Sequence, residues 1–303
     1  MTAPVLAVET CVRRLAALRD LERRPPALEV DVDVSWCGPA RFPPERQWSE
    51  ASIQALCGLM AVHGWDHGRP RRLGLEVASV AAGLLAASGT LAARIGARRG
   101  RPVRRVETSV LGAGLWLVAH HLAAATSEGE PLPSPAGPEP GPPFRSADGR
   151  WFEIEVFDPD GWRSFWGRLG AADADLGRAW TAFRARYYRG RCSLPTGLHA
   201  AAARHPLAEI IAAAASSGVS LCPVRSYLEV LRQPGPEHDR PLLGRGAGAS
   251  ALGAGRRPED RGDGGDLPLR GIRVVEATSR MQGPLAGLLL QMLGAEVIRV
   301  EPP

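Results

Sequence analysis

The chain has 303 residues, a length that suits one large domain or two ordinary ones. Hydrophobic residues make up 45% and charged residues 23%, a composition typical of a soluble globular protein. All 37 basic residues are arginines, and they give a formal net charge of +5. Because these arginines are scattered and not interleaved with aromatic residues, we expect no nucleic-acid partner. The first residues lack a basic segment followed by an apolar run, so we expect no signal peptide and a cytoplasmic protein.

The cysteines indicate reduced thiols. Their number is odd and no two of them form a CxxC pair, which argues against a disulfide framework or a cysteine-bound metal. The five are Cys11, Cys37, Cys57, Cys192 and Cys222.

Residues 1–125 alternate helical and extended patterns and predict a partial large α/β domain. The expected elements, in chain order, are a helix over 5–22, a strand over 27–36, a helix over 49–60, a helix over 76–97, a strand over 103–110 and a helix over 111–125. The helix over 49–60 opens with a capping signature at Ser49. The apolar run 77–93 is barely long enough to cross a bilayer and is rich in Ala, Gly and Ser, so we expect a buried helix and no membrane partner.

Residues 126–143 are dense in Pro, Gly and Glu and predict a linker. A small α+β domain is expected over 144–232, beginning with a hairpin that turns at Asp148-Gly149. Its further elements are helices over 160–170, 172–187 and 204–217, a strand over 219–224 and a helical turn over 226–231.

Residues 233–267 are rich in Gly, Pro, Arg and Asp, and their composition predicts a disordered linker. The last segment, 268–303, predicts a strand over 271–276, a helix over 284–293 and a strand over 295–300. Such a β-α-β unit builds a parallel sheet, and it needs further structure to cover it.

That segment, LRGIRVVEATSRMQGPLAGLLLQMLGAEVIRVEPP, resembles the opening of class III CoA-transferases, the CaiB/BaiF group. The earlier segments SEASIQALCGLM, FRSADGRWFEIEV and SSGVSLCPVRSYLEVL resemble later parts of the same family. The resemblance covers roughly residues 28–235 and 268–303. It implies an α/β fold, with a parallel-sheet, Rossmann-like large domain and a smaller α+β domain.

The order of the segments is unusual, because the family's later parts precede its opening. One interpretation is a truncated tandem copy, in which residues 268–303 start a second CoA-transferase copy. The other is a circular permutation, in which this unit completes the first sheet. We favour the first slightly.

The resemblance implies transfer of CoA between carboxylic acids by an Asp that becomes an acyl-CoA thioester carrier. In the family this Asp opens the apolar helix in a "D-aaG" pattern, and Ser79 stands at that position here. A hydroxyl cannot carry CoA as a thioester, so we expect Ser79 to be inactive and structural. Glu76, three residues earlier, is a candidate substitute carboxylate.

Related racemases use an Asp at the same position and a His before the "QA-SG" helix, where this chain has Ser49-Glu50. Both acid-base groups of a racemase are therefore replaced. His63 and His67 are expected in a loop, and His120 and His121 are expected to be structural, so we predict no metal site.

By the same resemblance, Met281, Gln282 and Arg299 are candidates for binding coenzyme A. Arg98, Arg99 and Arg101 form a second anion-attracting group. The alternative for all six is a role as solvent-facing charges or turn residues.

The expected ligands are an acyl-CoA and a small carboxylic acid, with CoA as substrate and the protein a homodimer or heteromer. Two functions are favoured, beside a weaker third, which is an intramolecular CoA transfer or a racemisation with replaced residues. One is a CoA-transferase-like protein whose active carboxylate comes from another copy or subunit. The other is a non-catalytic CoA-binding or scaffolding subunit.

Overall fold

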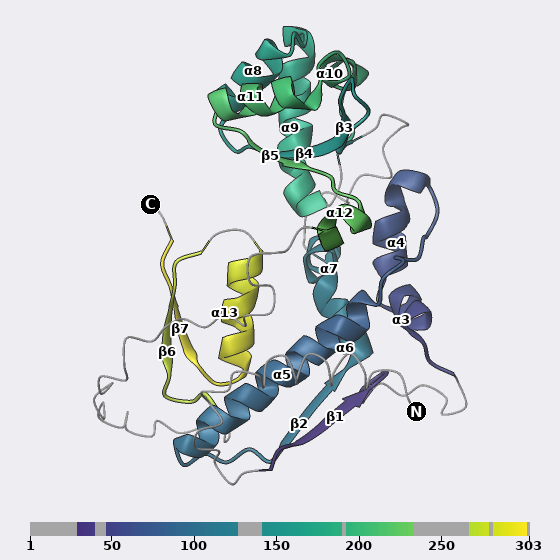
Figure 1. Cartoon of the computed structure of the whole chain (residues 1–303). Helices are drawn as coiled ribbons and strands as arrows, with labels where there is room; N and C mark the ends of the chain where they lie inside the picture. The colour runs from purple at the N-terminus through teal and green to yellow at the C-terminus, as the bar shows by residue number, and fades with distance from the viewer. Residues whose placement is uncertain are drawn as a thin grey trace. The chain divides into compact units, whose positions relative to one another are not determined.

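The computed structural model of the chain describes residues 29–39, 47–126, 141–189, 192–232, 267–278 and 281–301. The expected helix over 5–22 and nearly all of both expected linkers lie outside these residues. The described chain forms two compact units (Figure 1). Unit 1 takes in described parts of 1–59, 73–117 and 238–303, and unit 2 takes in described parts of 60–72 and 118–237.

Unit 1 is organised by the long helix α5 (Val77–Arg98), which packs on a parallel pair of strands, β1 (Asp31–Ser35) and β2 (Arg105–Ser109). Alternate side chains of each strand face the helix, as the valines of the sequence predict. The approach is close at Gly89, where an added Cβ would lie 2.7 Å from Val106 Cγ1. The small residues of α5 therefore let the helix backbone lie directly on the sheet.

Helices α3 (Glu50–Leu56) and α6 (Val110–Leu117) pack on the start of α5. The shared core is small and consists of the buried side chains Ile53, Ala78, Ala82, Val110 and Ala113.

The last described segment forms the expected β-α-β unit. Strand β6 (Arg273–Glu276) pairs in parallel with β7 (Glu296–Arg299), and α13 (Gln282–Met292) connects them. Leu269 and Ala295 pack on Ala92, which belongs to α5. The later half of α5 is therefore the cover that an isolated β-α-β unit lacks.

Two of the expected helices are each divided into two shorter helices. Gly58 has φ +86°, a left-handed conformation that ends α3 before α4 (Leu59–Gly64) begins, so the helix expected over 49–60 is interrupted. The helix expected over 111–125 is divided at Val118 into α6 and α7 (Ala119–Thr126).

Unit 2 contains an antiparallel sheet in the order β3-β4-β5, made of Phe144–Arg145, Trp151–Glu155 and Ser220–Pro223. The expected hairpin around Asp148-Gly149 is β3-β4, and Gly149 takes φ +78° in its turn. The described helices that follow β4 in this unit are α8 (Pro159–Arg168), α9 (Asp173–Arg189), α10 (Thr196–Ala202), α11 (Leu207–Ser216) and α12 (Tyr227–Arg232).

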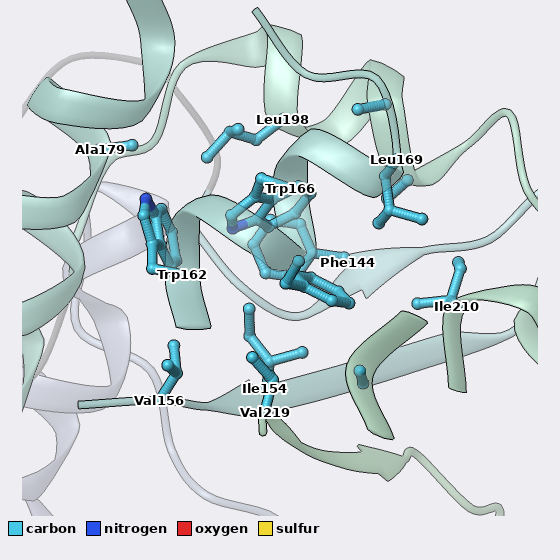
Figure 2. Packing of buried hydrophobic residues seen from close by; sticks show 14 of the residues in the cluster. Phe144, Ile154, Val156, Trp162, Trp166, Leu169, Ala179, Leu198, Ile210 and Val219 are labelled. Carbon is cyan, nitrogen blue, oxygen red and sulfur yellow. The ribbon is translucent and has the colours of Figure 1, made fainter. Parts of the chain in front are cut away.

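Aromatic side chains fill the core of unit 2 (Figure 2). Trp162, Trp166 and Phe144 are almost fully buried, and the Phe144 and Trp166 rings meet edge to face with centroids 4.9 Å apart. Leu198 and Ile210 pack from α10 and α11. This core is far larger than the clusters around Ile53 and Ala92 that the described residues of unit 1 form.

The expected fold class is confirmed in its coarse form, since the structure is a mixed α/β chain with small parallel sheets. The expected boundaries at 125, 144, 232 and 268 stay a prediction. Among the described residues, α5 is the one helix long and apolar enough to cross a membrane, but half of its most apolar window is buried inside the protein. That burial favours a core helix.

Candidate active site at the start of helix α5

Helix α5 begins without a cap from its own preceding residue. Glu76 occupies the N-cap position, but its side chain accepts no capping hydrogen bond and is exposed. The first backbone N–H groups of a helix have no partner inside the helix, so another group must accept them.

That group is the Glu50 carboxylate of α3. The backbone N–H of Ala78 donates to Glu50 Oε1 at 3.0 Å, and the backbone N–H of Ser79 donates to Oε2 at 2.9 Å. A negative charge at a helix N-terminus is also favoured by the helix dipole. Glu50 therefore caps α5 from a different helix.

The position of Glu50 is set by the start of its own helix. Ser49 caps α3 by accepting from the Ser52 N–H, while the Ser52 hydroxyl accepts from the Ser49 N–H at 2.8 Å. Gln54, one turn after Glu50, donates from Nε2 to Glu50 Oε1 at 3.0 Å. The same amide group bonds the Leu75 carbonyl and the Leu73 N–H, so it also holds the segment that enters α5.

Ser79 completes this network. Its hydroxyl donates to Glu50 Oε2 at 2.6 Å, a short charge-assisted bond. Ser79 is 2% exposed and Glu50 is 5% exposed. Burial raises the pKa of Glu50, but hydrogen bonds from Ser79, Gln54 and the Ala78 N–H together outweigh it and hold that pKa below its usual value.

This geometry makes Glu50 an ionised structural anchor. Four donors are directed at its two oxygens, and they stabilise the negative charge of the carboxylate. A carboxylate that attacks an acyl carbon gives up this charge, so the four hydrogen bonds make Glu50 a poorer nucleophile. The Ser79 hydroxyl is committed to the same carboxylate. The arrangement as it stands can fix the start of α5, and acyl chemistry there would first require these bonds to break.

The carboxylate that contacts Ser79 is therefore Glu50, whereas the sequence directed attention to Glu76. The sequence does contain a signal, because Glu50 and Gln54 lie four residues apart on one helix whose neighbouring side chain Ile53 is fully buried. Two polar side chains on a buried face need partners, and the start of α5 supplies them.

The candidate CoA-binding residues of the β-α-β unit lie at one edge of its sheet. Met281 and Gln282 stand at the start of α13, and Arg299 ends β7. The carboxyl ends of parallel strands and the following helix N-terminus share an edge, which is the usual ligand edge of such units. Arg299 Nε lies 2.9 Å from Glu301 Oε1 and 3.6 Å from the buried Glu276 Oε1, so carboxylates already balance its charge.

The second arginine group lies elsewhere in unit 1. Arg98, Arg99 and Arg101 stand at and beyond the end of α5. Arg99 donates a hydrogen bond to the carbonyl oxygen of Gly271, which lies just before β6. Arg99 therefore contacts the end of the sheet where the strands begin, whereas Arg299 lies at the end where they stop. Within one chain, the two arginine groups do not converge on a common point.

The four candidate histidines lie in unit 2 and show structural contacts. The loop expected at His63 is wrong, because His63 lies in helix α4, where its Nδ1 is 3.0 Å from the Arg71 carbonyl oxygen. His67 ends a short 3-10 helix, η1 (Trp65–His67). His121 is buried, and its ring meets Trp65 edge to face with centroids 5.2 Å apart. Burial, helped by neighbouring His120, lowers the pKa of His121 to about 4. In the part of the chain that the structure describes, no three His, Cys, Asp or Glu side chains gather as metal ligands would.

Comparison with solved structures supports a shared fold. A crystal structure of Rv3272 from M. tuberculosis aligns with a TM-score of 0.52 and 19% identity, covering 71% of this chain and 57% of that one. A CAIB/BAIF family protein from Brucella suis aligns with a TM-score of 0.50 and 19% identity, covering 68% and 55%. The chain thus spans little more than half the length of these proteins.

Comparison with curated proteins finds no match. The model of CoA-transferase family III, however, matches residues 45–240 and 269–303, which together are more than half of the chain. These two segments contain α3, the Glu50–Ser79 network and the β-α-β unit. On this match, the chain belongs to CoA-transferase family III.

Proposed function

We propose that this chain is a CoA-transferase-like protein that acts on an acyl-CoA and a carboxylic acid, with the reactive carboxylate supplied by another copy or subunit. The proposal rests on one observation, which is that position 79 holds a hydrogen-bonded serine and no free carboxylate. Ser79 gives its hydroxyl to Glu50, and Glu50 has both oxygens engaged by four donors.

The chemistry explains why another carboxylate is needed. Transfer of CoA through an enzyme-bound thioester starts when a carboxylate oxygen attacks the acyl carbonyl carbon, forming a mixed anhydride and releasing CoA thiolate. The thiolate then attacks the enzyme's carbonyl carbon, and the donor acid leaves as a carboxylate. The acceptor acid reverses these steps. A serine hydroxyl could not carry CoA in this way, because its side chain has no carbonyl carbon to which the sulfur could bond.

Coenzyme A is a substrate in this scheme, and its anionic phosphates need donors and positive charge. The start of α13 at Met281 and Gln282 offers backbone donors at one such place, and Arg299 beside it would have to leave Glu276 and Glu301 to pair with a phosphate. The arginines at positions 98, 99 and 101 offer the other. The free cysteines among the described residues, such as Cys57, fit the reducing cytoplasm that we propose as its location.

The packing of residues 267–301 supports one interpretation of the segment order. Leu269 and Ala295 contact Ala92 of α5, and Arg99 bonds Gly271. We therefore propose that this β-α-β unit belongs to the same large domain as α5, as a circular permutation implies.

A second candidate is a non-catalytic CoA-binding or scaffolding subunit. The low exposure of Ser79 and Glu50 favours it, because a buried and fully bonded pair is suited to stability and not to turnover.

Calorimetry with CoA and an assay of CoA exchange between an acyl-CoA and a labelled carboxylic acid separate the two functions. Saturable binding with exchange supports the transferase, binding without exchange supports the scaffold, and absence of binding contradicts both.

A designed pair of variants tests whether the rest of the site is intact. Glu50→Gln/Ser79→Asp places one free carboxylate at position 79, and mass spectrometry after incubation with acyl-CoA should then detect an enzyme-CoA thioester. Glu50→Gln alone is the matched control and should remain unmodified. A double variant that folds, binds CoA and forms no thioester would count against the proposed transferase site.

A further inference from the structure

A short loop of unit 2, directly after η1, has an unusual density of positive charge. We call residues 68–72 the arginine loop, because Arg69, Arg71 and Arg72 make up three of its five residues. All five residues are exposed to solvent. In the ten residues from 63 to 72, Asp66 is the one acidic residue of the sequence, so this segment has a net positive charge.

The three guanidinium groups of the arginine loop are not balanced by carboxylates. Other arginines of unit 2 are paired: Arg150 Nη2 lies 3.3 Å from Glu229 Oε1, and Arg186 Nη1 lies 2.8 Å from Glu153 Oε1. Among the described residues, no acidic side chain forms an ion pair with an arginine of the loop. An exposed guanidinium group without a counter-charge is available to an anionic ligand.

The start of the arginine loop is held in place by close backbone packing. Gly68 takes φ +64°, and its N–H donates to the Trp65 carbonyl oxygen at 3.2 Å, which ends η1. The chain then passes directly over Gly64 of α4. A Cβ at position 64 would overlap the Arg69 carbonyl oxygen and lie 2.7 Å from Pro70 Cα. The path of the loop therefore depends on the absence of a side chain at Gly64.

The second half of the loop is fixed by hydrogen bonds of the Arg71 backbone. Its N–H donates to the Met60 carbonyl oxygen at 2.9 Å, and its carbonyl oxygen lies 3.0 Å from His63 Nδ1. Pro70, between Arg69 and Arg71, restricts the backbone further. The arginines are thus presented from a preformed backbone, so a ligand would not have to order the main chain of the loop on binding.

We propose that the arginine loop binds a small molecule that carries phosphate groups. A guanidinium group can donate two parallel hydrogen bonds to one phosphate, and a diphosphate offers oxygens to more than one arginine. Arg71 and Arg72 are adjacent and Arg69 is two residues earlier, so one short segment supplies all three groups. None of the six candidate CoA-binding residues named above belongs to this loop.

Two sources supply this phosphate chemistry: the phosphates of CoA, or a separate phosphorylated ligand. The first source deepens the proposed function and rests on it, whereas the second does not. Calorimetric titration of the full chain with inorganic pyrophosphate tests the shared chemistry, and titration with CoA tests the first source. We expect saturable binding of pyrophosphate with a dissociation constant of roughly 10–1,000 μM.

A double substitution tests whether the loop is the binding site. Arg71→Gln/Arg72→Gln should raise the dissociation constant for pyrophosphate by at least about tenfold, because two charge-assisted donors are lost. The matched control is Arg163→Gln/Arg178→Gln, which removes the same net charge from exposed side chains of unit 2 and should change the constant by less than about twofold. Equal weakening by the two double variants would overturn the proposal.

A substitution that keeps every charge tests the preformed backbone. Gly64→Ala should displace the loop and raise the dissociation constant for pyrophosphate by at least about threefold. Gly177→Ala on α9, where nothing lies within 4 Å of an added Cβ, should leave the constant unchanged. Circular dichroism verifies the fold of each variant, and unchanged affinity in a folded Gly64→Ala variant would contradict the preformed loop. If Gly64→Ala fails to fold, the arginine variants still decide the proposal.

The CoA titration identifies the source of the phosphate. A loss of CoA affinity in Arg71→Gln/Arg72→Gln that parallels the loss for pyrophosphate assigns the loop to CoA. A loss for pyrophosphate alone assigns it to a separate phosphorylated ligand. Failure of the wild-type chain to bind either probe would overturn the proposal. So would flotation with phosphatidylglycerol vesicles that depends on the loop arginines and is not accompanied by pyrophosphate binding, since the partner would then be a membrane surface.

The loop site and the proposed function fail in different ways. Normal CoA exchange in Arg71→Gln/Arg72→Gln, with unchanged affinity for both probes, removes only the loop site. Loop-dependent binding of pyrophosphate by a chain that neither binds nor exchanges CoA removes only the proposed function.

Discussion

A single buried carboxylate organises the candidate site. Glu50 accepts from the side chains of Gln54 and Ser79 and from two backbone N–H groups, and it is nearly inaccessible to water. Charge-assisted hydrogen bonds are stronger than neutral ones. Removing the Glu50 carboxylate would leave its four buried donors without an acceptor. The free energy of unfolding should therefore depend strongly on this residue.

Glu50→Gln keeps the shape of the side chain but replaces one acceptor oxygen with an NH₂ group that faces donors. We expect the free energy of unfolding at pH 7 to fall by about 1–3 kcal/mol. Urea denaturation measures the change. Glu76→Gln, at an exposed position without a capping bond, should change it by less than about 0.5 kcal/mol. Equal effects of the two substitutions would show that the network contributes little.

The pH dependence of stability should report the same carboxylate. Its folded-state pKa is lowered, so its contribution is fully present above the unfolded value of about 4.3 and declines as the pH falls through the folded value. The stability difference between the wild-type protein and Glu50→Gln should therefore shrink between pH 5 and pH 3. A difference that grows on acidification would contradict this assignment.

The sequence identified Ser79 but not its partner. The family pattern points to Ser79, whereas Glu50 lies 29 residues away in the chain and on another helix. A contact of that range depends on how α3 packs on α5, and neither helical periodicity nor a capping signature specifies it.

Helix and strand positions followed from local chemistry, and the deviations have local causes. The capping residue Ser49 starts α3 as expected, and the long small-residue helix appears as α5. Gly58 interrupts the helix that the apolar pattern extended to residue 60. The sequence does not predict helix α10, because its seven residues, which follow Pro195 and include Gly197, are too few to show a periodic pattern.

The junction between α5 and the β-α-β unit relies on the absence of a side chain at Gly96. A Cβ there would lie 2.7 Å from the Arg101 carbonyl oxygen and 2.9 Å from Pro268 Cα, both backbone atoms that cannot rotate away. Gly96→Ala should therefore destabilise unit 1 by about 1–3 kcal/mol, despite the better helix propensity of Ala. Hydrogen exchange should show faster exchange of β6 and β7.

Gly167→Ala is the matched control for this substitution. Gly167 lies in helix α8, and nothing stands within 4 Å of an added Cβ. Here Ala should leave stability unchanged or raise it by up to about 1 kcal/mol. Equal changes in the free energy of unfolding for the two variants would show that the close approach at Gly96 does not limit stability.

Helix α7 should weaken in mild acid because of His121. Its folded-state pKa of about 4 lies below the unfolded value of about 6.5, so the unfolded chain binds more protons between these values and stability falls as the pH drops through this window. The full effect is on the order of 3 kcal/mol. His121→Phe keeps a ring against Trp65 and should flatten the dependence, as measured by denaturation at pH 7 and pH 5. An unchanged slope would contradict the buried neutral histidine.

At the scale of the molecule, the two units have unequal interiors. The core of unit 2 contains several aromatic rings in mutual contact. Among the described residues of unit 1, the apolar clusters around Ile53 and Ala92 are small and aliphatic, and large side chains of α5 and α13 are exposed. Apolar burial is the main favourable term in folding, so unit 2 is expected to be the more stable part.

Native-state hydrogen exchange of the whole chain checks this expectation. Amides of α8, α9 and β4 should exchange more slowly than those of β1, β2 and α13. Slower exchange throughout unit 1 would contradict the ranking.

The sequence predicted the succession of elements well but not their assembly. Arg99 and Gly271 are 172 residues apart, and their hydrogen bond joins two segments whose relation the sequence left open. Long-range packing of this kind depends on the complementarity of surfaces such as Ala92 and Ala295, which are only small apolar residues when read along the chain.

The Glu50–Ser79 bond also constrains the order in which substitutions can accumulate in a lineage. An aspartate arriving at position 79 while Glu50 remains would place a second negative group where a hydroxyl now lies 2.6 Å from the first, an intermediate with two touching like charges. A neutral residue at position 50 would remove that repulsion, so we expect an acidic side chain at position 79 to be tolerated best where position 50 changes first.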